Sequence, residues 1–431
     1  METPPIVNEF TNDSFHIMNE LLKSGELKKI QDDYLYWNKV KYRTTFNNKT
    51  DVWSAVKLHR KINSTLIKFG QYQFTFPNTD YIQRILHFFD LNIGGTLGSN
   101  IGIAETDKTK FIISSLMEEA ISSSQMEGAN TTRKKAKEMI QKDQKPSTKS
   151  EQMILNNYVT MRFISHYKNE NLTPELLLNI HSSISSKTLD NKEEEGQFRN
   201  NNEIFVQDVM SGENIHQPPP QEELAFLIQE LCNFFNKDSD DFIHPIIKGC
   251  IIHFMIGWIH PFTDGNGRTA RALFYWYMLK RGYWLTEYLS ISRIIKDTKN
   301  QYEKAYLYTE KDENDLGYFI TYHLKTMSKS FDALKEYINR KQKEVVQSAR
   351  FLTIPGVNER MAQLLKIVYD DPERVLNSKE VEKRFAISNF TARQDLKALV
   401  DLGFFKIIQV NKIKQNYIKS EGFDSLIQKM N

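Results

Sequence analysis

Apolar residues recur at spacings of three and four along most of the chain, which places them on one face of an α-helix. Between residues 110 and 141 this spacing predicts one long helix. Alternation of the kind that marks a β-strand is rare, so the pattern predicts a mainly α fold. The other clear helical segments are residues 15–27, 52–69, 81–89, 152–167, 224–235, 246–258 and 270–279.

One short extended stretch interrupts the helical pattern in the middle of the chain. Residues 203–207, Glu-Ile-Phe-Val-Gln, read as a strand, residues 211–214 as a turn, and Pro218 to Pro220 lead into the next helix. These signals predict a small β-hairpin. The glycine-rich residues 94–100 are predicted to be a plain connector, because no strand precedes them and no Lys-Ser/Thr pair follows.

The pattern changes near residue 351, after a charged helix predicted over residues 329–350. Asn377 caps a helix with Glu380 at the reciprocal position, and Ser388 caps a second helix that runs to Leu402. Residues 404–410 and 415–419 then predict a hairpin around Asn411 and Lys412. This order is typical of a winged helix. The predicted domains are an N-terminal helical region (1–105), a core (106–328), the connecting helix (329–350) and the winged helix (351–431).

Composition describes an ordinary globular chain of 431 residues with 40% hydrophobic and 26% charged residues and a formal net charge of +3. This balance excludes a strong overall attraction to nucleic acid, so any basic patch is local. Cys232 and Cys250 lie in apolar helical segments, which favours buried thiols in a reducing setting. Residues 1–43 lack the apolar core of a signal peptide, and the apolar run at 249–262 is too short to cross a bilayer. We therefore expect a cytoplasmic protein without a membrane segment.

The richest chemistry lies in residues 260–271, His-Pro-Phe-Thr-Asp-Gly-Asn-Gly-Arg-Thr-Ala-Arg. Gly265 and Gly267 allow a sharp turn that aims backbone N–H groups at one point where a helix begins, which is a site for an anion. Arg268 and Arg271 add charge for phosphate groups. Asp264 offers the oxygen that Mg²⁺ prefers, and His260 is a base that works near neutral pH.

This segment resembles the signature of Fic-domain proteins, H-P-F-x-D-G-N-G-R-x-x-R, in all nine specified positions. A looser element at residues 196–199, Gly-Gln-Phe-Arg, is similar to the segment that leads into the family's flap. The resemblance implies a Fic fold, a helical core with a small β-hairpin flap. It also implies transfer of AMP from ATP to a Ser, Thr or Tyr hydroxyl of a target protein, or of the chain itself. Relatives of the Doc type, which transfer phosphate, carry lysine where this chain has Gly267.

The resemblance assigns a role to each candidate residue. His260 would remove the proton of the attacking hydroxyl, and Asp264 would hold Mg²⁺ between the α- and β-phosphates. Tyr302 would border the adenine, with helix packing as the alternative, and Thr309 departs from the asparagine of relatives. The residues implied to hold the phosphates are Gly265, Asn266, Gly267, Arg268 and Arg271. The flap residues implied to pair with an extended target segment are Ile204, Phe205, Val206 and Gln207; a plain surface hairpin is the alternative.

Residues 123–128, Ser-Ser-Gln-Met-Glu-Gly, fit the pattern S/T-x-x-x-E-G/N of the inhibitory helix found in self-restrained Fic proteins. Ser123 and Glu127 are four residues apart and share one helix face. The resemblance implies that Glu127 pairs with Arg271 and occupies the arginine that the γ-phosphate needs. We therefore predict a resting state in which transfer is restrained.

Two other functions stay open. The first is a DNA-binding regulator in which the Fic unit senses nucleotide. Residues 372–431 hold 11 lysines and arginines against 7 acidic residues, and the winged helix could equally contact protein. Asp395 and Asp401 on the second helix weaken the DNA alternative. The second is removal of AMP from a modified target, with Glu127 aligning water. Separately, the behaviour of the family suggests that the chain forms homodimers. The residues that would face DNA are Asn389, Arg393, Gln394 and Lys397 on the helix and Lys406, Lys412 and Lys414 in the wing.

Overall fold

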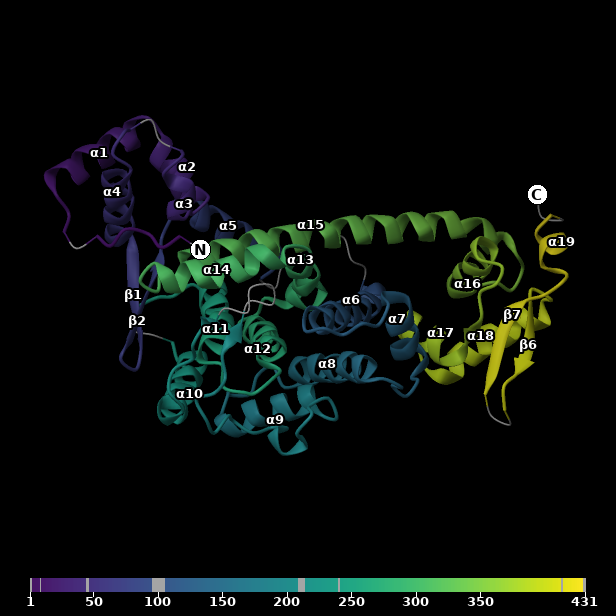
Figure 1. Ribbon diagram of the computed structural model, residues 1–431. Coiled ribbons are helices and arrows are strands. Elements are labelled where there is room, and N and C mark those ends of the chain that lie inside the picture. The colour runs from purple at the N-terminus through teal and green to yellow at the C-terminus, as the bar shows by residue number, and fades with distance from the viewer. Residues whose placement is uncertain are drawn as a thin grey trace.

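The computed structural model describes residues 2–7, 9–43, 46–94, 105–207, 214–238, 241–411 and 414–428. Most of these residues are helical, and the predicted mainly α class is confirmed (Figure 1). Three separate hydrophobic cores lie along the chain: a small N-terminal one, a large central one and a C-terminal one. None of the described helices is both long and apolar enough to cross a membrane.

The N-terminal core is built by α1 (Asn12–Lys23), α2 (Glu26–Asp32), α3 (Trp37–Val40) and α4 (Lys49–Ile62). The helix predicted over 15–27 is broken at Gly25, whose φ of 73° no helix interior adopts. The helix predicted over 52–69 was also wrong beyond Ile62. Its last residues form β1 (Ser64–Phe69), which pairs with β2 (Tyr72–Pro77) in an antiparallel hairpin, because aromatic and β-branched side chains flank a left-handed Gly70. Helix α5 (Asp80–Asn92) follows.

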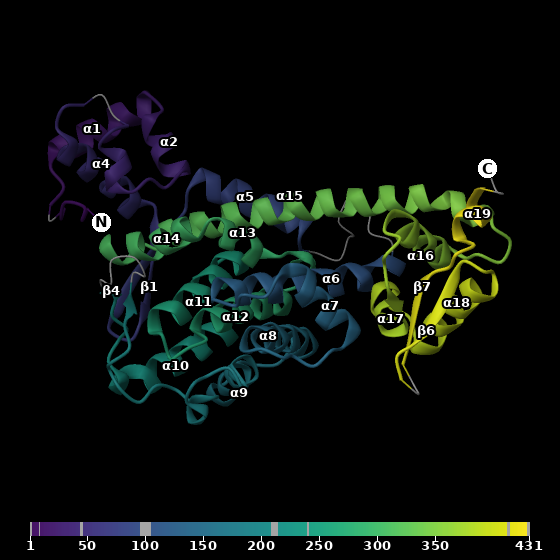
Figure 2. The ribbon, with the colours of Figure 1, turned by 45° about the vertical axis from the view of Figure 1, so that its right-hand side comes forward.

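The central core takes in β1, β2 and α5 and is completed by helices α6 to α14 and by α15 as far as Ile338. Their bounds are α6 (Glu105–Met126), α7 (Arg133–Lys142), α8 (Lys149–His166), α9 (Pro174–Ser185), α10 (Gln221–Asn236), α11 (Pro245–Ile259), α12 (Asn266–Lys280), α13 (Ile291–Asp297), α14 (Lys299–Lys311) and α15 (Gly317–Ser348), with 3₁₀ turns η1 (Lys192–Glu194), η2 (Trp284–Tyr288) and η3 (Ala349–Thr353). Helix α11 is buried almost throughout, so it forms the centre of the unit. Figure 2 shows α8, α9, α10 and α12 grouped around it.

The single helix predicted over 110–141 is two helices. Helix α6 ends at Met126 because Gly128 takes a φ of 93°, and Thr132 caps the start of α7 through the Lys135 N–H. The break lies directly after Glu127, so the glutamate ends a helix rather than sitting within one. The two buried thiols agree with the prediction: Cys232 and Cys250 are free and buried.

The predicted flap hairpin is present but short. Strand β3 (Val206–Gln207) pairs with β4 (Asn214–His216) in antiparallel fashion, with a register shift between the two β3 residues. The turn predicted at 211–214 lies outside the described residues apart from Asn214, which begins β4. The connector predicted at 94–100 also lies outside them, apart from Gly94.

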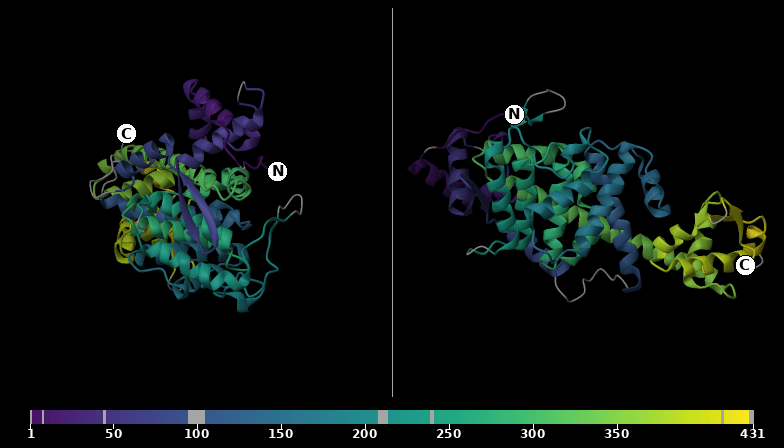
Figure 3. Two further views of the ribbon diagram at one scale, coloured as in Figure 1. Left: turned by 90° about the vertical axis from the view of Figure 1, so that its left-hand side faces the viewer. Right: turned by 90° about the horizontal axis from the view of Figure 1, so that it is seen from below.

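Helix α15 runs without interruption from the central core to the C-terminal unit (Figures 1 and 2). The connecting helix predicted over 329–350 is the second half of this longer helix, which starts where the Gly317 N–H donates to Asp315 Oδ1. Seen from below in Figure 3, the C-terminal unit projects from one end of the central core. Lys379 Nζ donates to Asp143, the C-cap of α7, at 2.7 Å, so an exposed ion pair joins the unit to that helix.

The C-terminal unit contains α16 (Glu359–Asp370), β5 (Leu376–Asn377), α17 (Ser378–Phe385), α18 (Asn389–Asp401), β6 (Phe405–Gln409), β7 (Gln415–Lys419) and α19 (Phe423–Gln428). Its sheet has the strand order β5-β7-β6. Both predicted N-caps are observed, since Asn377 accepts from Glu380 N and Ser388 accepts from Thr391 N. The predicted reciprocal bond is not observed, because the Glu380 side chain pairs with Arg374. Asn411 follows β6, whereas Lys412 lies outside the described residues. The winged-helix identity of this unit stays a prediction.

Candidate active site

The candidate site lies in the loop that joins α11 to α12. His260 ends α11 with a left-handed φ of 49°. Its ring Nδ1 is 3.2 Å from the Gly257 carbonyl, an acceptor, so the Nδ1–H donates and Nε2 is left free of a proton. Burial lowers the pKa of His260 to about 4, against a smaller opposing effect of that hydrogen bond. The side chain is therefore a neutral base at physiological pH.

Arg199 fixes the backbone of His260. Its Nε donates to the His260 carbonyl at 3.0 Å, its backbone N–H donates to Pro261 at 2.9 Å, and its Nη2 donates to Pro219 at 2.5 Å. The side chain is 3% exposed. The sequence drew attention to residues 196–199 only through a loose resemblance, and no spacing could show that Arg199 reaches a residue 61 positions away.

His181 of α9 was not predicted at all, yet it holds the other end of the loop. The Gly196 N–H donates to its Nδ1 at 3.1 Å, so its Nε2–H donates to the Asp264 carbonyl at 2.9 Å. The ring is stacked on Phe262 with centroids 3.7 Å apart. Burial lowers the pKa of His181 to about 4, so the ring stays neutral and keeps this tautomer.

Asn266 closes the loop on itself. Its side-chain Oδ1 accepts from Phe262 N at 3.0 Å, and its Nδ2 donates to Phe262 O at 2.8 Å. The resemblance implied a phosphate contact from this residue. Both polar side-chain atoms bond to Phe262, so the side chain shapes the loop. The backbone N–H at the start of α12 and the second N–H of Nδ2 are what Asn266 can offer an anion.

Asp264 points outward, with 55% of its side chain exposed. One oxygen accepts from Gly265 N and lies 3.6 Å from Arg268 Nη2, which leaves the other oxygen open to a cation. Among the described residues, no group of three or more His, Cys, Asp or Glu side chains converges as a metal cage would. Asp264 is thus suited to a Mg²⁺ ion that takes its other ligands from phosphate and water.

Arg268 and Arg271 of α12 are 1% and 3% exposed, respectively. Arg268 Nη1 donates to the Ile184 carbonyl at 3.1 Å, whereas its Nε and Nη2 have no hydrogen-bond partner among the described residues. The same is true of Arg271 Nη1. Buried guanidinium N–H groups without acceptors are costly, and they indicate a place for an anion beside the start of α12.

Residues at the end of α6 supply acceptors, one of them negatively charged, for part of the Arg271 guanidinium. Arg271 Nε donates to Ser123 Oγ at 2.8 Å, and Arg271 Nη2 donates to the Ser123 carbonyl at 3.1 Å and to Glu127 Oε1 at 2.8 Å. Burial raises the pKa of Glu127, but the charge and hydrogen bond of Arg271 outweigh it and hold the pKa below its usual value. The structure thus brings Ser123, Glu127 and Arg271 into one ion-paired cluster.

Gly267 lies directly under this carboxylate. A Cβ atom added at Gly267 would collide with Glu127 Oε1 and would lie 3.1 Å from Arg271 Nη1. The glycine therefore makes room for the glutamate in addition to shaping the turn.

Tyr302 of α14 is half-buried, and its hydroxyl is used within the core. The hydroxyl is 2.9 Å from His253 Nε2, while His253 Nδ1 is 2.9 Å from His323 Nε2. Burial raises the pKa of Tyr302 to about 12, so it stays protonated. These contacts favour the packing alternative for the hydroxyl.

The flap stands beside the base. His216, which ends β4, lies 2.8 Å from the Trp258 carbonyl through Nε2 and 2.8 Å from Glu310 through Nδ1, so it fastens the hairpin to α11 and α14. Phe205 is 37% exposed. Of the predicted flap residues, Val206 and Gln207 form the strand, and Ile204 and Phe205 lead into it.

Comparison of the sequence with known proteins shows which family this site resembles. Residues 171–278 match the Fic/DOC family. The chain is 34% identical over 90 residues to a protein adenylyltransferase Fic of Drosophila mojavensis, which is 21% of this chain and 16% of that protein. It is 30% identical over 116 residues to one of Nematostella vectensis, 27% of this chain and 25% of that protein. The chain thus aligns with a quarter or less of these relatives.

A solved structure extends the likeness beyond the matched segment. A form of Fic-1 from C. elegans covers 77% of this chain, which in turn covers 88% of that structure, with a TM-score of 0.52 and 16% identity. At this identity the likeness shows a shared fold.

Proposed function

Because residues 171–278 form a Fic domain, we propose that the protein is a protein adenylyltransferase that moves AMP from ATP to a Ser, Thr or Tyr hydroxyl. The acceptor would be a target protein or the chain itself. The observation that carries this proposal is the set of buried arginine N–H groups without acceptors, next to a neutral His260. The arginine N–H groups suit an anion, and the neutral imidazole suits the role of proton acceptor.

In the proposed reaction, His260 Nε2 takes the proton of the target hydroxyl as its oxygen attacks the α-phosphorus of ATP. A bond forms between that oxygen and the α-phosphorus, the bond from the α-phosphorus to the bridging oxygen breaks, and pyrophosphate leaves. Arg268, Arg271 and the backbone N–H groups at the start of α12 stabilise the charge that grows on the phosphate oxygens. The hydrogen bond from Nδ1–H to Gly257 keeps Nε2 aimed as the acceptor.

The site also fits Mg²⁺. Asp264 would hold the ion with its exposed carboxylate, and the unpaired N–H groups of Arg268 and Arg271 mark where the phosphates that share it would lie. When bound, Mg²⁺ neutralises phosphate charge and aligns the leaving pyrophosphate.

Restraint of AMP transfer would follow because Glu127 and ATP compete for Arg271. Glu127 accepts a hydrogen bond from Arg271 Nη2, and its carboxylate covers Gly267, so a phosphate in that position would meet a like charge. ATP would have to displace Glu127 to gain Arg271. We therefore propose that the chain rests in a restrained state.

We keep contact of the C-terminal unit with DNA as a second proposal, which the exposed Asp401 still weakens. Asp395, which as a surface charge would repel phosphate, is 5% exposed and paired with Arg360 at 2.6 Å. Because Asp395 is buried, its charge no longer argues against DNA binding. Phe390, 71% exposed on the same helix, suits a protein partner as well. Salt-dependent binding of duplex DNA that survives His260→Ala would support this function.

Intact-protein mass spectrometry after incubation with Mg²⁺ and ATP tests the main proposal. Wild type, Glu127→Gly and Glu127→Gly/His260→Ala are compared, with Glu170→Gly as an exposed glutamate control. We expect an AMP-sized mass gain in Glu127→Gly that is much smaller in wild type and Glu170→Gly and absent in the double variant. A gain that persists without His260 would refute its role as base. If no variant gains mass, loss of AMP from a pre-modified substrate becomes the next assay.

A further inference from the structure

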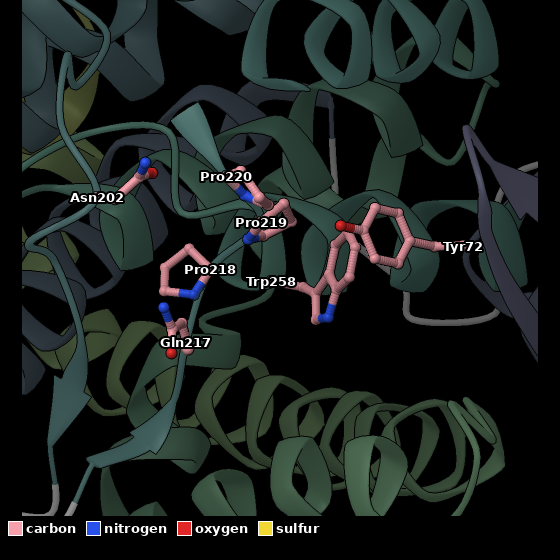
Figure 4. A pocket seen from close by; sticks show the side chains of 7 residues that line it. All are labelled: Tyr72, Asn202, Gln217, Pro218, Pro219, Pro220 and Trp258. Carbon is pink, nitrogen blue, oxygen red and sulfur yellow. The ribbon is translucent and has the colours of Figure 1, made fainter. Parts of the chain in front are cut away.

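A cavity of about 340 Å³ lies beside the flap, lined by Tyr72, Asn202, Gln217, Pro218, Pro219, Pro220 and Trp258 (Figure 4). Its volume is in the range of sites that receive ligands. The rings of Tyr72 and Trp258 meet edge to face, with centroids 4.8 Å apart. Among the described residues that line it, none is charged.

The cavity is built by the same elements that hold the candidate active site. Trp258 precedes His260 by two residues on the same helix, and its carbonyl receives the hydrogen bond of His216, which ends the flap. Asn202 lies just before β3, and Gln217 directly follows β4. A target segment paired with the flap would therefore pass the mouth of the cavity while its hydroxyl approached His260.

These walls are held in place before anything binds. Arg199 donates both to the Pro219 carbonyl and to the His260 carbonyl, so one buried side chain ties the cavity to the base. The hairpin that carries Tyr72 rests on α10 through a bond from Gln71 to Glu223 at 2.9 Å. A preformed pocket spares the cost of ordering its walls when a side chain enters.

The lining also selects the chemistry of the occupant. Two aromatic rings and three proline rings offer flat apolar surfaces that suit an aromatic side chain. The Gln217 amide can add a hydrogen bond, whereas the Asn202 amide is already bonded to Gln221 N and Glu222. Glu222 accepts a hydrogen bond from Asn202 and Glu223 lies beside Tyr72, so an anionic side chain would be repelled, and the peptide library separates an aromatic occupant from a cationic one. Tyr72 lies outside the segment that matches the Fic/DOC family, so this wall belongs to the N-terminal part of the chain.

We propose that this cavity receives an aromatic side chain of the target protein, at a fixed spacing from the modified hydroxyl in the segment that pairs with the flap. The proposal rests on the proposed adenylyl transfer and names the class of sequence that the enzyme selects. Tyr72 is then a specificity-determining residue that contacts the target and takes no part in the chemistry.

The test uses the full chain carrying Glu127→Gly, Mg²⁺-ATP and a library of peptides with one central Ser, Thr or Tyr and all other positions varied. AMP-modified peptides are sequenced by mass spectrometry. We expect aromatic residues to be enriched at one position. Tyr72→Ala should remove that enrichment and raise the KM of an aromatic-containing peptide about tenfold, with kcat and the KM of ATP unchanged. Tyr72→Phe should preserve the preference. Leu66→Ala, which alters an exposed residue of the same hairpin, is the matched control.

Each outcome is decisive. Peptide modification without an aromatic preference, or a preference that Tyr72→Ala leaves intact, overturns this proposal and leaves adenylyl transfer standing. If the chain modifies only itself, its modified sites are compared instead, and the lack of an aromatic residue at one shared spacing overturns the proposal. If no AMP is transferred to peptide or protein, the proposed function fails and this inference fails with it.

Discussion

Replacing Gly267 by alanine tests whether Glu127 and the phosphates compete for one space. The glycine has an ordinary helical conformation, so alanine adds a methyl group without backbone strain. That methyl would collide with Glu127 Oε1, and the carboxylate would have to leave its position beside Arg271. A charge-assisted hydrogen bond of this kind contributes about 1.5–3 kcal/mol, so the restrained state should be weakened by about 10- to 150-fold.

The same methyl also crowds the phosphate site, so the single variant does not report the release alone. A double-mutant cycle separates the two effects, because crowding acts equally whether or not Glu127 is present. Initial rates of AMP transfer are measured for wild type, Gly267→Ala, Glu127→Gly and the double variant. The compared quantity is the ratio of the Gly267→Ala rate to the rate of the parent with glycine. We expect this ratio to be about 10- to 150-fold higher when Glu127 is present than in the Glu127→Gly background.

An additive cycle would refute the reasoning, since it would mean that the alanine leaves the hold of Glu127 unchanged. Gly422→Ala serves as the control, because it has no atom closer than 3.9 Å to an added Cβ and lies in the C-terminal unit. Its effect should be small and equal in both backgrounds.

Three further predictions follow from the same contacts. Glu127→Gln keeps the shape of the side chain and removes its charge, so calorimetry should show a larger gain in affinity for ATP than for ADP; equal gains would place Glu127 away from the γ-phosphate. Arg199→Lys keeps the backbone bond to Pro261, but one ammonium group cannot replace the guanidinium that joins the His260 and Pro219 carbonyls. The kcat should therefore fall about 10- to 100-fold with little change in the KM of ATP, and an unchanged kcat would dismiss the positioning role of Arg199. His260 has a folded pKa of about 4, below the ordinary 6.5, so kcat of the Glu127→Gly variant should hold down to about pH 4. Because the unfolded chain takes up this proton first, the free energy of unfolding should decline as the pH falls from 6.5 toward 4, and an acid limb of kcat near pH 6.5 would contradict the burial effect.

The chemistry of the loop could be predicted from the sequence because its residues are adjacent there. His260, Asp264, Arg268 and Arg271 lie within twelve positions, and a helix start brings adjacent residues to one place. Glu127 lies 144 residues away from Arg271, and the family pattern, not spacing, pointed to its partner.

The residues that hold the loop could not be predicted in this way. A histidine in an apolar helix gives no sign that its ring joins Gly196 to the Asp264 carbonyl, as His181 does. The side chain of Asn266 looked free for phosphate, yet it bonds back to Phe262, since an amide can satisfy a neighbouring backbone as readily as a ligand.

Several helix ends were predicted wrongly for a related reason. Apolar spacing continues across Gly25 and Gly128, although each adopts a positive φ that ends the helix. Beyond Ile62 the same apolar residues form a strand, because a hairpin partner at residues 72–77 can bury them equally well. Periodicity shows which residues seek burial, whereas the partner decides in which conformation they reach it.

The burial of Arg271 gives a physical reason why an acidic side chain would be an effective restraint, as we propose for Glu127. The Arg271 guanidinium is 3% exposed, so it needs a counter-charge in every state of the site. Glu127 supplies one in the structure described, and the polyphosphate of ATP would supply another. Activation is then an exchange of one anion for another, not the exposure of a bare buried charge. The two states can lie close in free energy, and a bias of a few kcal/mol on the end of α6 is enough to shift the population between them.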